Sequence, residues 1–283
     1  MSQTLSNELL PFSADTQWYL SEASPATTGA HREAIKRVIE VMHERLDAPL
    51  SLHDMSRIAY ISPYHFNRVF HQITGIPPCQ FLYALRLEMA KRLLLTTHVS
   101  VTDVCFDVGY NSLGTFIRRF TGLVGISPAR FRSLALSSRL SLEQIAPRAD
   151  MALPRANCTL TGKITAPAGF AGTIFIGLFT TPIPQGRPVA GTTMAQPGAY
   201  SIPFVPDGQY YILAAGLPCS EDPRGYFLYE SSLRGRGRAI CILNGQVKGC
   251  TDVALRPPMP FDPPILLALP LLLAESIGRL SLV

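Results

Sequence analysis

A short segment at residues 63–74 combines side chains that form directed hydrogen bonds with side chains that must be buried. Helical spacing places its apolar residues on one side and leaves the other side to six polar or aromatic residues: Tyr64, His65, Asn67, Arg68, His71 and Gln72. Asn67 matches the hydrogen-bonding edge of adenine and Arg68 that of guanine, and each bidentate contact is worth about 1–3 kcal/mol of discrimination. Arg68 could instead pair only with a phosphate or a neighbouring carboxylate. This face therefore suits recognition of base edges.

The same segment recurs about fifty residues later. Seven residues return at that offset: Phe66, Arg68, Phe70, Gly75, Ile76, Pro78 and Phe81 as Phe116, Arg118, Phe120, Gly125, Ile126, Pro128 and Phe131. Upstream, a Ser-x-x-Asp capping box returns at an offset of forty-nine, so the second copy holds one extra residue, which we expect in a turn. Each copy has the boundary signals of two short helices joined by a tight turn, which predicts tandem helix-turn-helix units.

The second copy offers fewer side chains for base recognition. Leu113 and Gly114 stand where polar residues would be expected, which leaves Thr115 and Arg118. Leu113 could touch a thymine methyl or pack inside the unit. The phosphate candidates are Arg57, His71, Gln72, Arg119, Arg130 and Arg132. Charge and position near helix ends add Lys91 and Arg92, and most of these basic residues could equally be solvated surface groups. We expect the first unit to dominate specificity and the second to dominate salt-dependent affinity.

Seven helices must position these side chains. Apolar periodicity and capping residues place them at about 32–46, 51–59, 62–75, 80–97, 100–108, 112 to between 122 and 125, and 127–131. The helix at 80–97 joins the two copies. Tyr60 occupies the turn position that Gly109 fills in the second copy, so we expect strain or a different turn there. Residues 1–30 lack sustained periodicity and predict a flexible leader.

Charge and composition limit the classes of protein. Net charge is +5, and residues 31–140 alone hold fourteen Lys or Arg against eight Asp or Glu, which favours a polyanionic partner. The first residues do not read as a secretory signal, and the longest apolar run, Ile265–Ala274, is too short to cross a membrane. We therefore expect a cytoplasmic protein without a membrane partner, and we expect the apolar run to form a docked tail or a short buried helix.

Metal and cofactor chemistry is not indicated. The six cysteines form no C-x-x-C pair, and the histidines are scattered without carboxylates at motif spacing. The second half contains no histidine, which excludes a Ser/His/Asp set there. The sequence thus predicts a protein that is not an enzyme and that holds no metal and no cofactor.

Residues 34–132 resemble the DNA-binding domain of AraC/XylS-type transcriptional regulators. The resemblance is carried by SLHDMSRIAYISPYHFNRVFHQITG, LRLEMAKRLLL and SVTDVCFDVGYNSLGTFIRRFTGLVGISPARFR. It implies that the second helix of each unit enters one of two successive major grooves on one face of double-stranded DNA. It also implies that positions matching Tyr64, Asn67 and Arg68 often face bases. RNA polymerase becomes a partner if the protein activates transcription.

Beyond a linker at 139–156, the sequence period becomes two. Alternating runs such as Ile174-Ile176-Leu178 and Tyr200-Ile202-Phe204, separated by Gly, Pro and Asp-Gly turns, predict a β-sandwich at 157–256. Asn244-Gly245 is a two-residue hairpin signal. Residues 157–216 resemble carboxypeptidase-regulatory-like, prealbumin-like domains through their L-x-G-x-I opening, G-x-Y-x-I strand and Pro-Asp-Gly turn. A Pro-rich apolar tail at 257–283 completes the chain.

Several roles stay open for the β-domain. It could hold a small-molecule effector in a pocket, or it could form a homodimer or recruit another protein. Arg234, Arg236 and Arg238 alternate with glycine and could hold an anionic effector, approach DNA, or be solvated. The leading hypothesis is a regulator with a double helix-turn-helix domain at 31–138, a domain order that inverts the commonest family arrangement. The alternative is an interaction or scaffold protein that binds DNA weakly and without specificity.

Overall fold

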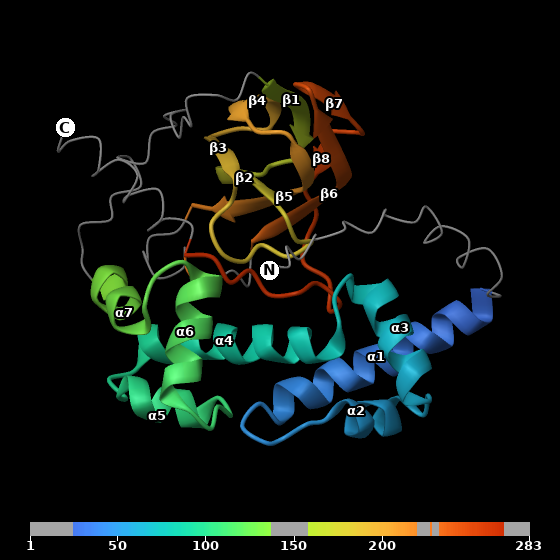
Figure 1. Cartoon of the computed structure of the whole chain (residues 1–283), viewed down its shortest axis with the longest axis vertical. Helices are drawn as coiled ribbons and strands as arrows, with labels where there is room; N and C mark the ends of the chain where they lie inside the picture. Colours follow the sequence, from blue (N-terminus) through green and yellow to red (C-terminus); the bar gives the residue numbers. More distant parts are fainter. Residues whose placement is uncertain (1–24, 137–157, 220–226, 228–231, 269–283) are drawn as a thin grey trace, which may run out of the picture.

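The computed structural model describes residues 25–136, 158–219, 227 and 232–268. A helical part comes first and a β-rich part follows, stacked on one side of the helices (Figure 1). Within the described residues the helices are α1 Pro25–Glu44, α2 Leu52–Ala59, α3 Pro63–Thr74, α4 Pro78–Thr96, α5 Val101–Asp107, α6 Leu113–Val124 and α7 Pro128–Leu136. The predicted linker at 139–156, leader residues 1–24 and tail residues 269–283 lie outside the described part of the chain.

The helix boundaries follow the predicted caps with two differences. Ser51 and Asp54 form the expected capping box at the start of α2, with Ser51 N donating to Asp54 Oδ2 at 3.0 Å and Asp54 N to Ser51 Oγ at 3.2 Å. α1 begins at Pro25, six residues inside the predicted leader, and α7 runs to Leu136 rather than ending at Phe131. α3 and α6 end at Gly75 and Gly125 in the left-handed conformation, as their sequence position suggests.

The repeated phenylalanines make the same contacts in both copies. The ring centroids of Phe66 and Phe70 lie 5.6 Å apart, and those of Phe70 and Phe81 lie 5.5 Å apart. In the second copy, the centroids of Phe120 lie 5.7 Å from those of Phe116 and of Phe131. All are fully buried, so each set forms the centre of one unit. The internal repeat therefore encodes two cores of the same design.

The extra residue of the second copy lies in the turn before α6, as expected. Position 60 ends α2 in the left-handed conformation (φ 56°) although it is a tyrosine, and its side chain is 89 % exposed. Its counterpart Gly109 has φ 78°, and a Cβ there would lie 2.5 Å from the carbonyl oxygen of Leu46. The first turn tolerates a side chain because that side chain points into solvent, whereas the second turn has no space for one.

A buried arginine on α4 ties the two units together. The Nη1 of Arg86 donates to the carbonyl oxygen of Gly109 at 3.0 Å, and its Nη2 donates to that of Ala48 at 2.8 Å. Gly109 belongs to the second unit, whereas Ala48 lies in the loop that enters α2 of the first. Two of the three guanidinium nitrogens are thus hydrogen-bonded to main-chain acceptors, which fixes the connecting helix relative to both units.

The β-rich part contains two sheets in the described residues. The strands are β1 Cys158–Thr165, β2 Gly172–Phe179, β3 Ala190–Met194, β4 Gly198–Val205, β5 Gly208–Pro218, β6 Leu233–Leu243, β7 Gln246–Lys248 and β8 Val253–Ala254. One sheet has the order β4-β1-β8 and the other β3-β2-β5-β6-β7. All pairs are antiparallel except β1 with β8. One buried cluster takes residues from both sheets, including Leu160, Ile176 and Ile212.

Two turn signals of the β-rich part have different outcomes. Asn244 and Gly245 both have positive φ and join β6 to β7, which confirms the predicted hairpin, and their amides donate to the carboxylate of Asp207. The expected alternation fails at Phe204, which has φ 58° and is exposed, while the next residue, Val205, is buried. A shift of register between Cys158 and Leu160 on β1 opposes this point, so a bulge reverses the side chains.

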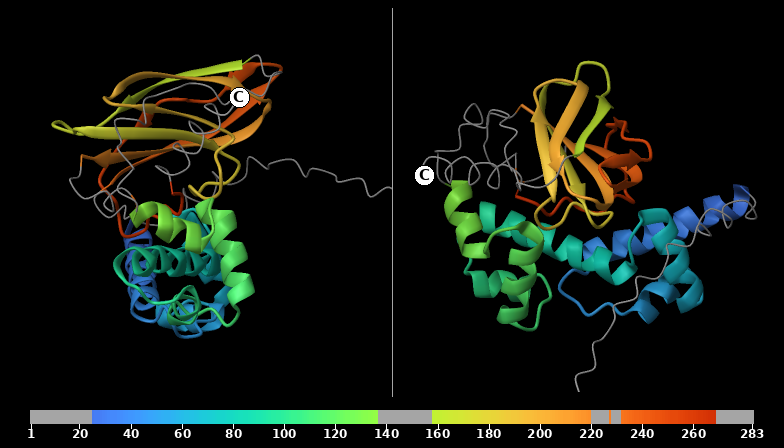
Figure 2. Two further views of the ribbon diagram at one scale, coloured as in Figure 1. Left: turned by 90° about the vertical axis from the view of Figure 1, so that its left-hand side faces the viewer. Right: turned by 45° about the horizontal axis from the view of Figure 1, so that its top comes forward.

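The β-rich part completes the cores of the helices. Residues 256–268, here called the strap, run between the sheets and the helices (Figures 1 and 2). Leu266 and Ala268 of the strap, with Phe227, join the core of the second unit, and Ile183 of the β2–β3 loop joins the core of the first. These side chains are almost wholly buried. The apolar tail is thus docked up to residue 268, and the two parts share packed cores.

Candidate nucleic-acid interface

α3 displays the polar side chains that the sequence assigned to it. Ser62 precedes Pro63 at the first helical position, and the inward residues Phe66, Val69 and Phe70 fix the rotation of the helix. The outward residues are exposed: Tyr64, Asn67, Arg68, His71 and Gln72. Tyr64 is 85 % exposed. Besides the guanidinium of Arg68, the other four side chains also carry hydrogen-bonding groups.

His65 differs from its neighbours on α3. Its ring is half-buried and meets the ring of His31 on α1 edge to face, with the centroids 5.3 Å apart. Burial lowers the pKa of His65, and the nearby Arg68 and His31 lower it further. The imidazole therefore favours its neutral form and packs against α1, which places it beside the exposed face rather than at its centre.

α6 presents a less polar face than α3. Ser112 caps it by accepting from Thr115 N at 3.4 Å, and Phe116 and Phe120 point inward. Gly114 and Arg118 are exposed, and Thr115 and Leu113 are half-buried. Ile117, which is 38 % exposed, stands at the repeat position of Asn67 and was not among the predicted contacts. Comparing the two copies position by position would have found it.

Two of the predicted phosphate contacts, Arg119 and Arg132, make contacts within the helical part. The guanidinium of Arg119 stacks on the ring of Tyr83 of α4, 4.0 Å from its centroid. Arg132 donates to the carbonyl oxygens of Leu94 and Val99 at the end of α4, at 3.2 and 2.6 Å. Both arginines occupy repeat positions whose first-copy counterparts are buried and apolar, which explains why they turn inward.

Lys91 was wrongly interpreted as a surface group. It is 1 % exposed, and its Nζ donates to the carbonyl oxygen of Ile265 in the strap at 3.0 Å. Burial lowers its pKa to about 7. By contrast Arg57, near the end of α2, and Arg130, in the first turn of α7, are exposed. These two keep the location that a phosphate contact requires.

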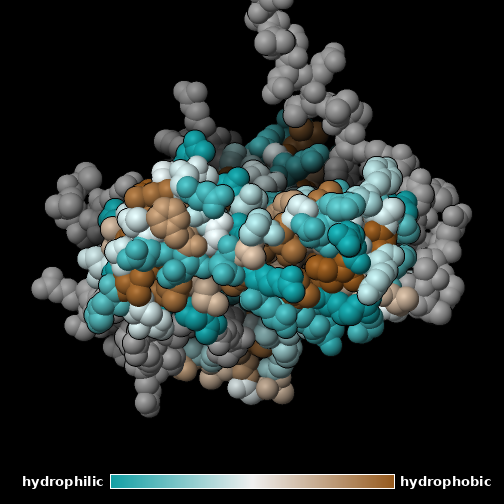
Figure 3. Space-filling view, turned by 90° about the horizontal axis from the view of Figure 1, so that it is seen from below, coloured by the Kyte–Doolittle hydropathy of each residue, from teal (hydrophilic) through white to brown (hydrophobic). Residues whose placement is uncertain are grey.

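The helical surface opposite the sheets mixes hydrophilic and apolar residues. Figure 3 shows this end of the molecule as interspersed hydrophilic and hydrophobic patches. Large apolar side chains at the surface include Tyr60, Tyr64 and Phe106. In the residues described, no group of three or more His, Cys, Asp or Glu could hold a metal ion. No described helix is long and apolar enough to cross a membrane.

Comparisons with known proteins agree with this geometry. Residues 55–134 match a family model described as a helix-turn-helix domain. The bifunctional transcriptional activator/DNA repair enzyme AdaA of Bacillus subtilis is 30% identical over 103 residues, which cover 36% of this chain and 49% of that protein. The HTH-type transcriptional activator AarP of Providencia stuartii is 30% identical over 98 residues, which cover 35% of this chain and 73% of AarP.

A solved structure, the DNA-binding domain of AdpA in complex with a target DNA, is 30% identical to this chain with a TM-score of 0.37, covering 38% of this chain and 97% of that one. This chain spans about a third to a half of the length of the first curated relatives it matches. The tandem units define a double helix-turn-helix protein. By its match to AarP and to the domain model, the chain belongs to the AraC-type helix-turn-helix family of transcriptional regulators.

Proposed function

We propose that the chain is a sequence-specific DNA-binding regulator of transcription. α3 and α6 are its recognition helices, and each enters one of two successive major grooves of double-stranded DNA. The observation that carries this proposal is the exposed polar face of α3, held outward by a buried phenylalanine cluster that recurs under α6. We assign no catalytic step to the chain, and we place it in the cytoplasm with its DNA.

The side chains divide by the contacts that their chemistry allows. Asn67 and Arg68 contact bases directly, with Tyr64 beside them. Arg118 and Thr115 contact bases from α6, and the apolar Ile117 suits a thymine methyl. The phosphate set is Arg57, His71, Gln72 and Arg130, all of them exposed. Arg119 and Arg132 are left out because their guanidinium groups are held inside the helical part, and His65 acts by positioning α3 against α1.

The two helices then contribute unequally. α3 offers an amide, a guanidinium and a phenol, whereas α6 offers one guanidinium, a half-buried hydroxyl and an apolar side chain. Hydrogen bonds to base edges discriminate more strongly than a methyl contact. The first half-site should therefore tolerate fewer base changes than the second.

Selection of bound sequences from a random DNA library tests the proposal. The expected outcome is a bipartite site whose halves are separated by about one helical turn, roughly 10–10.5 base pairs, with the stricter half assigned to α3 by repeating the selection with R68A. A salt titration on the selected and a scrambled site then gives the specificity ratio. A ratio near one would support the alternative, an interaction or scaffold protein with weak, non-specific DNA binding.

We also propose a controlling role for the β-rich part. The domain division is a leader, a double helix-turn-helix domain, a linker, a β-sandwich of the carboxypeptidase-regulatory-like type, and a tail. The single core shared by both sheets supports the sandwich. The sandwich either binds a small-molecule effector or mediates assembly, for instance as a homodimer, and RNA polymerase is the further partner if the protein activates. Analytical ultracentrifugation with and without operator DNA distinguishes assembly from effector control.

A further inference from the structure

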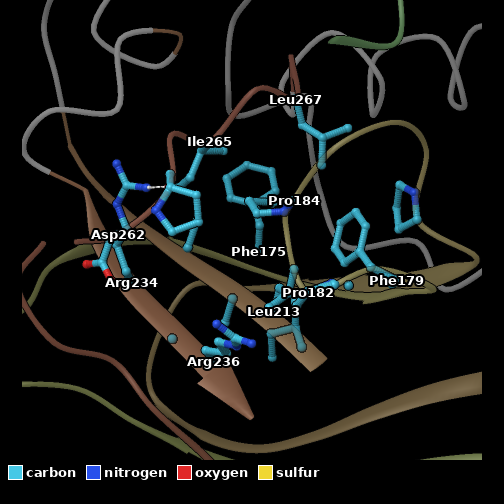
Figure 4. A pocket seen from close by; sticks show the side chains of 18 of the residues that line it. Phe175, Phe179, Pro182, Pro184, Leu213, Arg234, Arg236, Asp262, Ile265 and Leu267 are labelled. Atoms are coloured by element: carbon cyan, nitrogen blue, oxygen red, sulfur yellow. Dashed lines mark hydrogen bonds between the residues drawn. The ribbon is translucent and has the colours of Figure 1, made fainter. Parts of the chain in front are cut away.

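A cavity of about 250 Å³ lies between the five-stranded sheet, the end of α3 and the strap (Figure 4). It opens on the face of the sheet that is turned away from the shared core, because neighbouring residues of β2 point alternately to the two sides. Its walls are largely apolar and include Phe175, Phe179, Leu213, Ile265 and Leu267. The volume is slightly below the roughly 300–1,000 Å³ of most ligand pockets. It accommodates a single ring or a short carbon chain.

Among the described residues, the charged side chains around the cavity are almost all of one sign. Four of them are arginines, Arg187, Arg234, Arg236 and Arg256, and one is an acid, Asp262. Arg256 neutralises that acid through two hydrogen bonds of 2.7 Å between its guanidinium and the carboxylate. Within the described lining, arginines therefore outnumber acids, and positive charge is available at Arg236. An apolar cavity with this charge favours a small anion over a neutral or cationic ligand.

Arg236 of β6 is the group best placed to hold the anion. Arg234, two residues earlier, already donates from Nη1 to the carbonyl oxygen of Pro263 at 2.7 Å. No hydrogen bond or ion pair within the described part of the chain engages the guanidinium of Arg236, and its side chain remains exposed to solvent. Figure 4 shows it on the side of the cavity opposite Ile265, near Leu213. Its planar donor groups match a carboxylate.

The cavity borders the end of α3 directly and is connected to the end of α6 through the β2–β3 loop. Ile73 and Thr74, the last residues of α3, line it, and a Cβ on Gly75 would lie 2.9 Å from Nη2 and 3.0 Å from Cζ of Arg236. The β2–β3 loop supplies lining prolines, and its Gly186 donates to the carbonyl oxygen of Leu123 in the last turn of α6 at 2.8 Å. A ligand here therefore touches elements that hold α3 and α6 in place.

We propose that this cavity binds a small apolar monocarboxylate, with the carboxylate on Arg236 and the carbon skeleton between Phe175, Leu213 and the strap. The ligand repositions Arg236 against the end of α3 and thereby changes the affinity for DNA. The regulatory consequence rests on the proposed function, whereas the binding site itself does not. The cavity is thus an effector site formed jointly by the β-rich part and the first helix-turn-helix unit.

Calorimetric titration of the full chain with phenylacetate and hexanoate, and with their neutral amides, tests the site. We expect saturable binding of at least one carboxylate, at least about tenfold tighter than its amide, because a charge-assisted hydrogen bond is lost in the amide. R236Q should abolish this difference. R238Q is the matched control, since Arg238 lies two residues further along β6 and outside the cavity lining. It should bind like the wild type.

The outcomes test the carboxylate site and the proposed DNA-binding function independently. Failure of both carboxylates to bind up to about 10 mM, or equal binding by R236Q, overturns the site. With the site established, saturating carboxylate should change the dissociation constant for the selected DNA about fivefold or more in the wild type and not in R236Q. An unchanged value overturns the coupling. Carboxylate binding by a chain that lacks sequence-specific DNA binding leaves the site standing and refutes the proposed function.

Discussion

Lys91 gives a quantitative test of the contact between the strap and the helices. An unfolded lysine keeps its proton up to a pH near 10.5, whereas burial in the folded chain lowers the pKa of Lys91 to about 7. Between these two values unfolding takes up a proton, so a rise in pH disfavours unfolding and stabilises the fold. The charges that act on Lys91 are Glu88, which raises its pKa, and Arg234 of β6, which lowers it.

The magnitude follows from proton linkage. For a single group with these two pKa values, the free energy of unfolding rises by about 2–3 kcal/mol between pH 7.5 and pH 9.5. K91M removes the titrating group, so the stability of the wild type relative to K91M should increase by that amount over this interval. Cysteines and tyrosines that titrate nearby act equally in both proteins, and their effects cancel in the difference.

Urea unfolding at constant ionic strength, repeated at several pH values, measures this difference. K163M serves as the control, because Lys163 lies exposed on β1 and its replacement should leave the pH dependence as in the wild type. A wild-type advantage over K91M that stays constant within about 0.5 kcal/mol across the interval would refute the assignment. Lys91 would then titrate alike in the folded and unfolded chains, contrary to its burial beneath the strap.

Three further predictions concern DNA contact, shared packing and the second turn. R68A should weaken binding to the best DNA site by about 1–3 kcal/mol and relax the preference at one base pair, whereas R57A should weaken binding to all sequences alike. A uniform loss of affinity with R68A would contradict a base contact by Arg68. L266A should lower the free energy of unfolding in urea by about 2–5 kcal/mol, since its side chain is wholly buried, while L243A at an exposed site should change it by less than about 0.5 kcal/mol; similar values for both would exclude a shared core. G109A should cost more than about 1 kcal/mol in thermal unfolding, and an unchanged Tm would show that this turn can accommodate a Cβ.

The repeat made the helical part predictable to the level of single caps. Its apolar period, capping boxes and C-terminal glycines depend on neighbours within one turn of helix, which sequence spacing displays directly. The contacts of Arg119 and Arg132 within the helical part were not predicted because these residues were judged by charge alone. Their counterparts in the first copy, Val69 and Leu82, are buried, so the repeat itself indicates an inward direction. Ile117 was overlooked because the two copies were not compared at the position of Asn67.

Contacts between the helical part and the β-rich part could not be predicted from the sequence. Lys91 and Ile265 are 174 residues apart, and no period connects a lysine on one helix with a carbonyl on a distant strap. The sequence of the strap is a short apolar run without periodicity, because an extended segment buried against helices leaves no periodic signal. The alternating arginines of β6 were noticed, but which of them contacts the end of α3 depends on the face of the sheet that meets this helix. Packing of the whole chain determines that face.

The position of the β-rich part suggests how two units of equal design can be controlled together. It contacts both recognition helices at their C-terminal ends, through Arg236 against Gly75 and through the amides of Gly186 and Ala268, which donate to Leu123 and Val124 at 2.8 and 3.1 Å. The exposed faces of α3 and α6 are left uncovered by these contacts. A signal delivered at the helix ends can therefore alter the relative orientation of the two faces without competing with DNA for either. Because affinity for a bipartite site depends on both faces fitting at once, a small change of orientation suffices.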